Sequence, residues 1–515
     1  MRDLVIIEAE GKLRHFYQIF AEIGYKADLF ATLGFFLDNP KSFKDTAVRL
    51  RSGEFIEPFR EPVRPDAYLR LKHTIQSCSG RIVIATDNDH EGHVIASDIA
   101  ELVKQINPKA PIFRALFTAL DKNSVAQALT HLTELDPTLA YPGTARRITD
   151  RIIGHHYSDF NHFRPVGRIQ SALLGLAHDE QYVLSIKPMS VPAADGRAPF
   201  VAPVPIRTGQ TPADLIAQLN GTKLETTSMA MMPISTPLNG GEALLLLSKG
   251  LDLSVRTAAG LLQSMYEAGE ISYHRTMGTG YSEEGKQVIA NLAQIRGVLG
   301  FKRSSLPSMG SNDNHEALRV LDLDKLNKID INKPVGLQPN ERSAALALIA
   351  QRNIQSGLMV RRDIPNITSL PEWAKKLDWK RESRIAMPWK KTEITGDLSA
   401  EQTVLFALTE HELGRPSTYP GHVDRFIERG LVDNQFKLTE RGQNWLQAAP
   451  DSLRDALTSF KIEALLNDGG DDVRSLVIDA LSLVAEGRND ELEHILEQLE
   501  EMDLPEPENV ARLHL

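Results

Sequence analysis

The sequence contains a single cysteine, Cys78, among 515 residues. One cysteine excludes a disulfide framework and a zinc ribbon built from several cysteines, and it is typical of a reducing compartment such as the cytoplasm. No apolar run approaches the ~18 residues that a membrane-spanning helix requires. The first residues form a strand-like run that a carboxylate interrupts at Glu8, which is not the pattern of a signal peptide. We therefore expect a cytoplasmic protein without a membrane partner.

The acidic residues outnumber the basic ones, 68 Asp and Glu against 58 Lys and Arg, which gives a net charge of −10. This excess is confined to one end of the chain. The segment from Glu463 to the end holds fifteen acidic and three basic residues, a net of −12, which leaves +2 for residues 1–462. The body of the chain is nearly neutral, so local basic clusters can still form a DNA-facing surface.

Hydrophobic periodicity divides the chain into segments of different character, and its length allows roughly three to four domains. Two strand–loop–helix units, with strands at 4–7 and 82–84, predict a parallel α/β sheet in the first ~140 residues. Prolines that include Pro212 break any helix in residues 188–238 and predict a β-rich segment there, and residues 358–392 have a similar character. The remainder is mostly helical. The resulting order of segments, α/β, α, β, α, β and α, predicts a chain that leaves domains and re-enters them.

Carboxylates follow the two predicted strands at the points where each strand ends. Glu8 follows the first strand, and Asp87, Asp89 and Glu91 follow the second. Ligands bind at the carboxyl ends of strands in α/β sheets, and four carboxylates close together repel one another unless a cation is present. Oxygen ligands favour Mg²⁺. The alternative interpretation is a solvated acidic turn that caps the following helix.

Six segments of the chain, in order, resemble the motifs of type IA DNA topoisomerases. The first is a pair, Glu8 to Lys12 with Asp87-x-Asp89-x-Glu91-Gly92, which is similar to a TOPRIM domain. The others are Ala145 to Gly154 (arginine helix), Gly167 to Ser171, Met265 to Thr276 (tyrosine motif), Asn314 to Arg319 and Gly414 to Tyr419. One motif alone would be weak, but six collinear motifs between residues 8 and 419 are specific. The resemblance is closest to a core-only member of the bacterial topoisomerase I and III type, without C-terminal zinc ribbons.

The resemblance implies catalytic roles for five side chains. Tyr273 would attack the DNA backbone and form a 5′-phosphotyrosyl ester, which stores the energy of the broken bond. Arg275 would pair with the scissile phosphate, and His315 would contact the same region. Lys12 would act as general acid for the leaving 3′ oxygen, and Glu8 would lie near the 3′ hydroxyl and assist rejoining.

The resemblance also implies a metal site and a DNA-binding surface. Asp87, Asp89 and Glu91 would hold Mg²⁺, which would position the released end for religation. The DNA-binding residues would be Arg146, Arg147, Arg168, Gln170, Ser171, Arg415, Ser417 and Thr418. Phosphate contacts of this kind give affinity without sequence specificity.

Structural interpretations of the same residues stay open. Tyr273 and His315 could be packed core side chains. The arginines could form a salt-bridged helical surface, in which Arg146 and Asp150 have i,i+4 spacing. Thr418 and its neighbours could cap a helix.

The sequence departs from the family pattern at several positions around these motifs. His90 and His93 replace an arginine and a glutamate beside the TOPRIM carboxylates, and Phe35 replaces a histidine. Met277 and Gly278 replace an acidic residue and a small hydroxyl residue after the tyrosine motif. These departures bear on the number of bound metal ions and on the rate rather than on the type of reaction.

The fold class that the resemblance implies is multidomain: a TOPRIM α/β domain followed by helical and β-rich parts of a toroidal type IA core. The expected domains are 1–143 (TOPRIM), 144–187 with 393–515 (helical, DNA-binding), 188–237 with 358–392 (β-rich arch), and 238–357 (helical, with the tyrosine). The expected function is ATP-independent cleavage of one DNA strand, strand passage and religation. The sequence does not separate relaxation from decatenation.

The expected partner is DNA, with a single-stranded segment at the cleavage site and a second strand in the central hole. A helicase or a single-strand-binding protein stays open as a further partner, and the chain is expected to act as a monomer. Two alternatives remain. A TOPRIM nuclease or primase-like enzyme would use the carboxylates and metal alone, and a catalytically decayed relative would only bind DNA.

Overall fold

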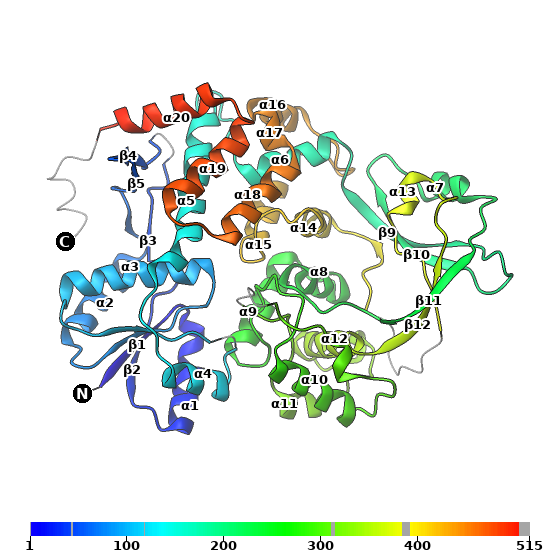
Figure 1. Ribbon diagram of the computed structural model, residues 1–515, viewed down its shortest axis with the longest axis horizontal. Helices are drawn as coiled ribbons and strands as arrows, with labels where there is room; N and C mark the ends of the chain where they lie inside the picture. Colours follow the sequence, from blue (N-terminus) through cyan, green and yellow to red (C-terminus); the bar gives the residue numbers. More distant parts are fainter. Residues whose placement is uncertain are drawn as a thin grey trace. The chain divides into compact units, whose positions relative to one another are not determined.

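The computed structural model describes residues 2–34, 36–42, 45–117, 119–310, 315–383 and 392–503. The chain divides into two compact units (Figure 1). The first consists of Met1–Gly175 together with Glu440–Leu515, and the second is Leu176–Thr439. Both ends of the chain therefore contribute to one unit. The finer division into four domains stays a prediction.

The first unit is built on a four-stranded parallel sheet with the order β2-β1-β7-β8. Helices lie on both sides of this sheet, α2 and α3 on one and α1 and α4 on the other (Figure 1). The strands are Asp3–Ile7 (β1), Ala27–Ala31 (β2), Ile82–Ile84 (β7) and Ile112–Arg114 (β8); the helices are Leu13–Ile23 (α1), Pro65–Ser77 (α2), His90–Ile106 (α3) and Lys122–Thr130 (α4). The predicted parallel α/β sheet is confirmed.

The central strands are continuous apolar runs because helices cover both of their faces. Leu4, Ile6, Ile82 and Ile84 pack with α2 and α3 in one buried cluster. This packing holds β1 and β7 side by side, so the residues that follow the two strands emerge at the same edge of the sheet.

The C-terminal helices of the first unit share a second apolar core with α5. This core joins α5, the β4–β5 hairpin and the helices α18 to α20, and its members include Val48, Ile152 and Val477. The elements are Arg49–Arg51 (β4), Glu54–Ile56 (β5), Tyr141–Tyr157 (α5), Arg168–His178 (α6), Glu440–Ala448 (α16), Asp451–Arg454 (α17), Ala456–Asp468 (α18), Val473–Ala485 (α19) and Asn489–Glu501 (α20). The unit boundary lies within α6.

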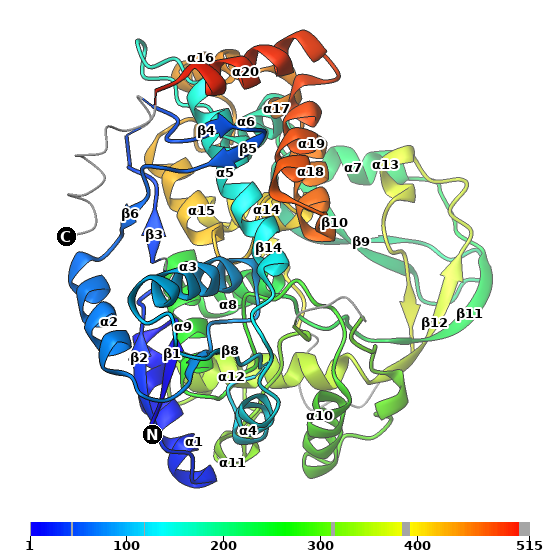
Figure 2. The ribbon, with the colours of Figure 1, turned by 60° about the vertical axis from the view of Figure 1, so that its left-hand side comes forward.

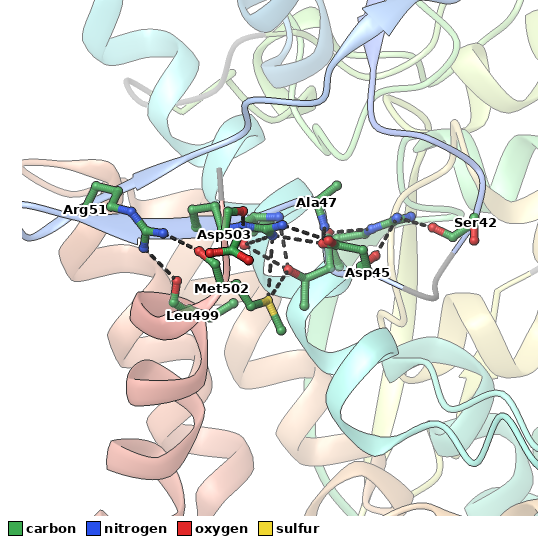
Figure 3. Close-up of polar contacts among 11 residues, drawn as sticks. Ser42, Asp45, Ala47, Arg51, Leu499, Met502 and Asp503 are labelled. Atoms are coloured by element: carbon green, nitrogen blue, oxygen red, sulfur yellow. Dashed lines mark hydrogen bonds and ion pairs between the residues drawn. The ribbon is translucent and has the colours of Figure 1, made fainter. Parts of the chain in front are cut away.

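A polar cluster links Ser42 and residues 45–51 to the end of α20 (Figure 3). Arg51 donates from Nη1 to the carbonyl oxygens of Leu499, at 3.2 Å, and Glu500, at 2.6 Å, and from Nη2 to that of Met502. A guanidinium at this position satisfies carbonyl groups that a helix end leaves unpaired, and its charge is favourable at the negative end of the helix dipole.

Replacing Arg51 with Ala is expected to loosen the last turn of α20, because three carbonyl groups lose their donor. The local cost should be about 1–2 kcal/mol. Amide hydrogen exchange in 497–501 should accelerate accordingly. Arg488→Ala, at the opposite end of the same helix, is the matched control and should leave exchange in the last turn unchanged. Equal exchange in both variants would show that Arg51 does not stabilise this helix end.

The second unit contains two three-stranded sheets and a group of helices. The sheet orders are β10-β9-β14 and β11-β12-β13, and β11 runs beside β12 in both views (Figure 1, Figure 2). The strands are Val183–Val191 (β9), Phe200–Arg207 (β10), Thr226–Pro233 (β11), Met359–Pro365 (β12), Arg381–Glu382 (β13) and Gly396–Asp397 (β14). The main helices are Gly240–Leu251 (α8), Val255–Glu267 (α9), Glu283–Ile295 (α10), Glu341–Gln355 (α12), Ala400–Glu410 (α14) and Tyr419–Glu428 (α15).

One expectation for the β-rich segment is wrong. Pro212 was expected to break any helix, yet it is the first residue of α7 (Pro212–Leu219). A proline is favourable at the first helical position because that position needs no N–H donor and the ring sets the required φ. Thr211 caps the helix, with its hydroxyl accepting from the Asp214 amide.

None of the helices in the described ranges is long and apolar enough to cross a membrane.

Candidate functional site

The carboxylates of the first unit lie at the edge of the sheet where β1 and β7 end. The pairing of Leu4 with Ile82 and of Ile6 with Ile84 places the two strands in register. Glu8 follows β1 directly, and Asp87 follows β7 after two further residues. The neighbouring positions expected for these two strands are confirmed.

Lys12 and Asp87 form a buried ion pair at this edge. The Lys12 Nζ donates to Asp87 Oδ1, and the two residues are 1% and 5% exposed. Lys12 ends the short helix Glu10–Lys12 that follows β1, so the same loop supplies both Lys12 and Glu8. The contact with the Asp87 carboxylate holds the Lys12 ammonium in a fixed orientation.

Asp89 has a structural role in this loop. Its Oδ1 accepts from the Gly92 amide at 2.7 Å and caps the N-terminus of α3. A Cβ atom on Gly92 would lie 2.1 Å from the Asp87 carbonyl oxygen, so only glycine fits there. The helix-capping alternative is therefore correct for Asp89, and it fixes the direction in which the loop from Asp87 to Glu91 runs.

Glu8 is buried in an environment that disfavours its charge. Burial, and after it the charge of Asp87, raises the pKa of Glu8 to about 8, although Lys12 acts in the opposite direction. Its Oε2 atom is buried and has no hydrogen-bond partner among the described residues. An oxygen without a donor can accept one from a substrate hydroxyl or approach a cation.

The carboxylates at this edge of the sheet are the candidate ligands for a metal ion. Within the described ranges, no group of three or more His, Cys, Asp or Glu side chains is arranged to hold a metal ion. Mg²⁺ is commonly bound through one or two carboxylates and keeps several waters beside phosphate oxygens. Asp87, with Glu8 alongside, offers such a set.

Arg114 is a site residue that the sequence analysis missed. Its guanidinium donates to the carbonyl oxygens of Ile84 at 2.9 Å and Asp87 at 3.0 Å. These hydrogen bonds fix the backbone of the segment that follows β7. Burial lowers the pKa of Arg114 to about 10, and the nearby Asp87, Asp89 and Glu8 oppose this shift. Arg114 is the last residue of β8, and this position at a strand end is the one feature of the sequence that could have identified Arg114 as a site residue.

The three arginines predicted to bind DNA on α5 and α6 are paired with carboxylates. Arg146 contacts Glu463 at 2.8 Å, and Arg147 holds Glu57 with contacts from 2.5 to 3.2 Å. Arg168 contacts both Glu463 and Asp150. A salt-bridged helical surface is thus present, but Arg146 pairs with Glu463 rather than with Asp150.

The other residues of the predicted DNA-binding set near α6 are Gln170 and Ser171. Gln170 donates from Nε2 to the Pro165 carbonyl oxygen at 3.4 Å, and Ser171 is buried. Their contact with DNA stays a prediction.

Tyr273 lies in the second unit and is stacked on His315. The two ring centroids are 4.1 Å apart with an interplanar angle of 28°, and Tyr266 meets Tyr273 edge-on at 5.3 Å. An antiparallel bridge between Ile271 and Val320 brings the two segments together. The sequence motifs include Tyr273 and His315, but they do not predict that the two rings stack.

The Tyr273 side chain is enclosed, with an exposure of only 2%. Arg275, two residues later, is half-buried and donates from Nη2 to Gln263 Oε1 at 3.0 Å. Tyr273 and Arg275 therefore lie on one short segment, and the His315 ring stacks on the Tyr273 ring.

The predicted phosphate contacts Arg415, Ser417 and Thr418 precede α15. Thr418 occupies the N-cap position, but its hydroxyl donates back to the Arg415 carbonyl oxygen at 2.9 Å and does not cap the helix. Thr418 is exposed, and Arg415 and Ser417 are half-buried. The capping alternative therefore does not account for the Thr418 hydroxyl.

Two predicted features fall on residues outside the described ranges, namely Phe35 and Asn314. The carboxylates, Lys12 and the arginines of α5 belong to the first compact unit, whereas Tyr273, Arg275, His315 and Arg415 belong to the second.

Comparison of the sequence with known protein families identifies the class of the N-terminal domain. Residues 3–120 match the Toprim domain, a metal-binding domain. The chain is also similar to reverse gyrase 2 of Aeropyrum pernix, with 24% identity over 410 residues. That match covers 69% of this chain and 32% of the relative, so the chain spans about a third of its length.

The fold resembles that of full-length topoisomerase I from Thermotoga maritima. The TM-score is 0.63 at 18% identity, and the match covers 96% of this chain and 90% of that one. At this identity the match shows the fold. Together the comparisons confirm the resemblance to type IA DNA topoisomerases and the fold class, a Toprim α/β domain followed by the helical and β-rich parts of a type IA core.

Proposed function

We propose that this chain is a type IA DNA topoisomerase that needs no ATP. It cleaves one DNA strand through a 5′-phosphotyrosyl link on Tyr273, allows a second strand to pass and rejoins the first. The observation that carries the proposal is the stacked pair of Tyr273 and His315 beside Arg275, in a chain whose N-terminal domain matches Toprim. The substrate is DNA, a single strand at the cleavage site, and the chain acts as a monomer.

Cleavage exchanges one phosphoester bond for another, which is why no ATP is needed. The Tyr273 oxygen attacks phosphorus, the bond from phosphorus to the 3′ oxygen breaks, and the phenol proton passes to water. Lys12 supplies a proton to the departing 3′ oxygen. Arg275 and His315 stabilise the charge that develops on the phosphate.

Rejoining requires the 3′ hydroxyl to give up its proton and attack the phosphotyrosine. The raised pKa of Glu8, about 8, suits this exchange, because the carboxyl can donate to the 3′ oxygen when protonated and accept its proton when ionised. Asp87, with Glu8 alongside, would bind Mg²⁺ through one or two carboxylates and waters, and Asp89 and Glu91 in the same loop are the further proposed ligands. The ion would supply positive charge beside the released end. Asp89 also accepts from the Gly92 amide and caps α3, which fixes the position of its carboxylate.

The enclosure of Tyr273 has a consequence for the reaction. A side chain that is 2% exposed cannot reach a DNA phosphate without a rearrangement of its surroundings. Cleavage therefore includes an opening step before the chemistry, as strand passage also requires.

The test uses single-stranded DNA labelled at one end, Mg²⁺ and no ATP, with the reaction stopped by detergent. A topoisomerase gives protein covalently attached to the 5′ end of the downstream fragment, and peptide mapping should locate the phosphodiester on Tyr273. It should also relax negatively supercoiled plasmid. Free ends without adduct would indicate a Toprim nuclease, and DNA binding without cleavage would indicate a decayed relative; either result rejects the proposal.

A further inference from the structure

Four charged side chains from three helices of the first unit form an alternating chain, Arg146–Glu463–Arg168–Asp150. Glu463 Oε2 lies 2.8 Å from Arg146, and its Oε1 lies 2.8 Å from Arg168. Asp150 Oδ1 accepts from Arg168 Nε at 3.0 Å. The arginines come from α5 and α6, and Glu463 comes from α18, where the acidic C-terminal segment begins (Figure 1).

The formal charge of this chain is zero, and most of it is buried. The side chains of Arg168 and Glu463 are 2% and 6% exposed, whereas that of Asp150 is 45% exposed. In the free protein, two guanidiniums proposed to bind DNA are thus neutralised by two carboxylates. Phosphate binding depends on uncompensated cationic charge, so the carboxylates reduce the attraction for DNA.

The two carboxylates do not accept from every N–H group of the two guanidiniums. Arg146 Nε and Arg168 Nη1 are buried, and neither has a hydrogen-bond partner among the described residues. Buried N–H donors without an acceptor are rare and costly. Phosphate oxygens accept from two N–H groups of one guanidinium at once, so a phosphodiester in place of Glu463 would satisfy donors that the carboxylates do not reach. Because the Arg168 side chain is only 2% exposed, this exchange requires Glu463 to move away from the arginines.

We propose that Glu463 is an internal counter-ion which occupies Arg146 and Arg168 in the free protein and competes with a DNA phosphate for them. The inference rests on the proposed function, because it takes DNA as the ligand of these arginines. It assigns to the beginning of the acidic segment a part in setting DNA affinity.

Glu463→Gln tests the competition with little change of shape. The amide keeps the size of the side chain but removes its charge, so Arg146 and Arg168 should attract phosphate more strongly. The Kd for a single-stranded oligonucleotide should fall by about five- to tenfold at low salt. The plot of log K against log salt should steepen by about 0.7, the contribution of one further phosphate contact on single-stranded DNA.

The matched control is Asp468→Asn, an exposed carboxylate on the same helix. It changes the net charge equally, and it should alter the Kd by less than about twofold because the charge is screened. Because Glu463 is buried, thermal unfolding of Glu463→Gln is measured in parallel. If that variant does not fold, Asp150→Asn replaces it: Asp150 is the more exposed counter-charge of Arg168, and its neutralisation should tighten binding in the same direction.

The two proposals fail differently. A folded Glu463→Gln protein that binds DNA as the wild type does would overturn the competition, and so would weaker binding, which would mean that Glu463 orients the arginines. In both cases the Tyr273 adduct would still form. Loss of both DNA binding and adduct formation in the wild-type protein would instead reject the proposed function.

Discussion

Replacing Tyr273 with Phe is expected to abolish the covalent adduct with DNA and to lower relaxation activity by about a thousandfold or more. The substitution removes only the nucleophilic oxygen. The ring keeps its stacking on His315, at 4.1 Å, and its edge contact with Tyr266. The variant should therefore fold normally and bind single-stranded DNA with a Kd near that of the wild type, which separates binding from chemistry.

A second enclosed tyrosine offers the matched control. Tyr281 is also buried, and its hydroxyl accepts from Asn353 Nδ2 at 3.2 Å. Tyr281→Phe loses that hydrogen bond, at a cost of about 1 kcal/mol in stability, and should retain the adduct. An adduct that persists in Tyr273→Phe, or one that disappears in Tyr281→Phe alone, would show that the nucleophile has been wrongly assigned.

Local patterns were sufficient to predict the sheet of the first unit. Apolar runs at 4–7 and 82–84, each followed by acidic residues, predict two buried parallel strands, and parallel strands present their carboxyl ends at the same edge. The pairing of Leu4 with Ile82 confirms this step. The prediction succeeded because strand identity and direction depend on neighbouring residues.

Contacts between distant segments could not be predicted in the same way. Glu463 lies 317 positions after Arg146, and Glu57 lies 90 positions before Arg147, so no periodicity connects the partners. The i,i+4 pair of Arg146 with Asp150 was the one partner that local spacing could offer, and the tertiary contact took precedence over it. Buried pairs of this kind depend on how the helices pack. The packing of α5 against α18 depends on many apolar residues together, so no single residue predicts it.

The stacking of Tyr273 on His315 shows the intermediate case. The motifs identified both residues as members of one site, but their mutual geometry depends on the bridge from Ile271 to Val320 and on the Ser272 amide, which donates to the Arg319 carbonyl oxygen at 2.9 Å. The enclosure of Tyr273 was likewise outside what a motif can show, because burial depends on the whole fold around a residue.

Glu8→Gln is expected to make the protein more resistant to unfolding at high pH. The pKa of Glu8 is raised from 4.5 to about 8 in the folded chain. The folded state thus retains a proton that the unfolded state releases, so this group favours folding fully below pH 4.5 and loses that contribution as pH rises to about 8. Gln remains neutral throughout. In EDTA, the unfolding free energy of Glu8→Gln relative to wild type should rise between pH 5 and 8 by as much as about 4 kcal/mol.

Denaturant unfolding at a series of pH values measures this difference, and Glu10→Gln, two positions later and exposed, should follow the wild-type curve. Saturating Mg²⁺ should shrink the gap between Glu8→Gln and wild type, because a nearby cation favours the ionised carboxylate and lowers its folded pKa. Parallel curves for wild type and Glu8→Gln in EDTA would mean that Glu8 is already ionised in the folded protein near neutral pH. Glu8 would then be unable to donate a proton to the 3′ oxygen, and Lys12 alone would have to supply it.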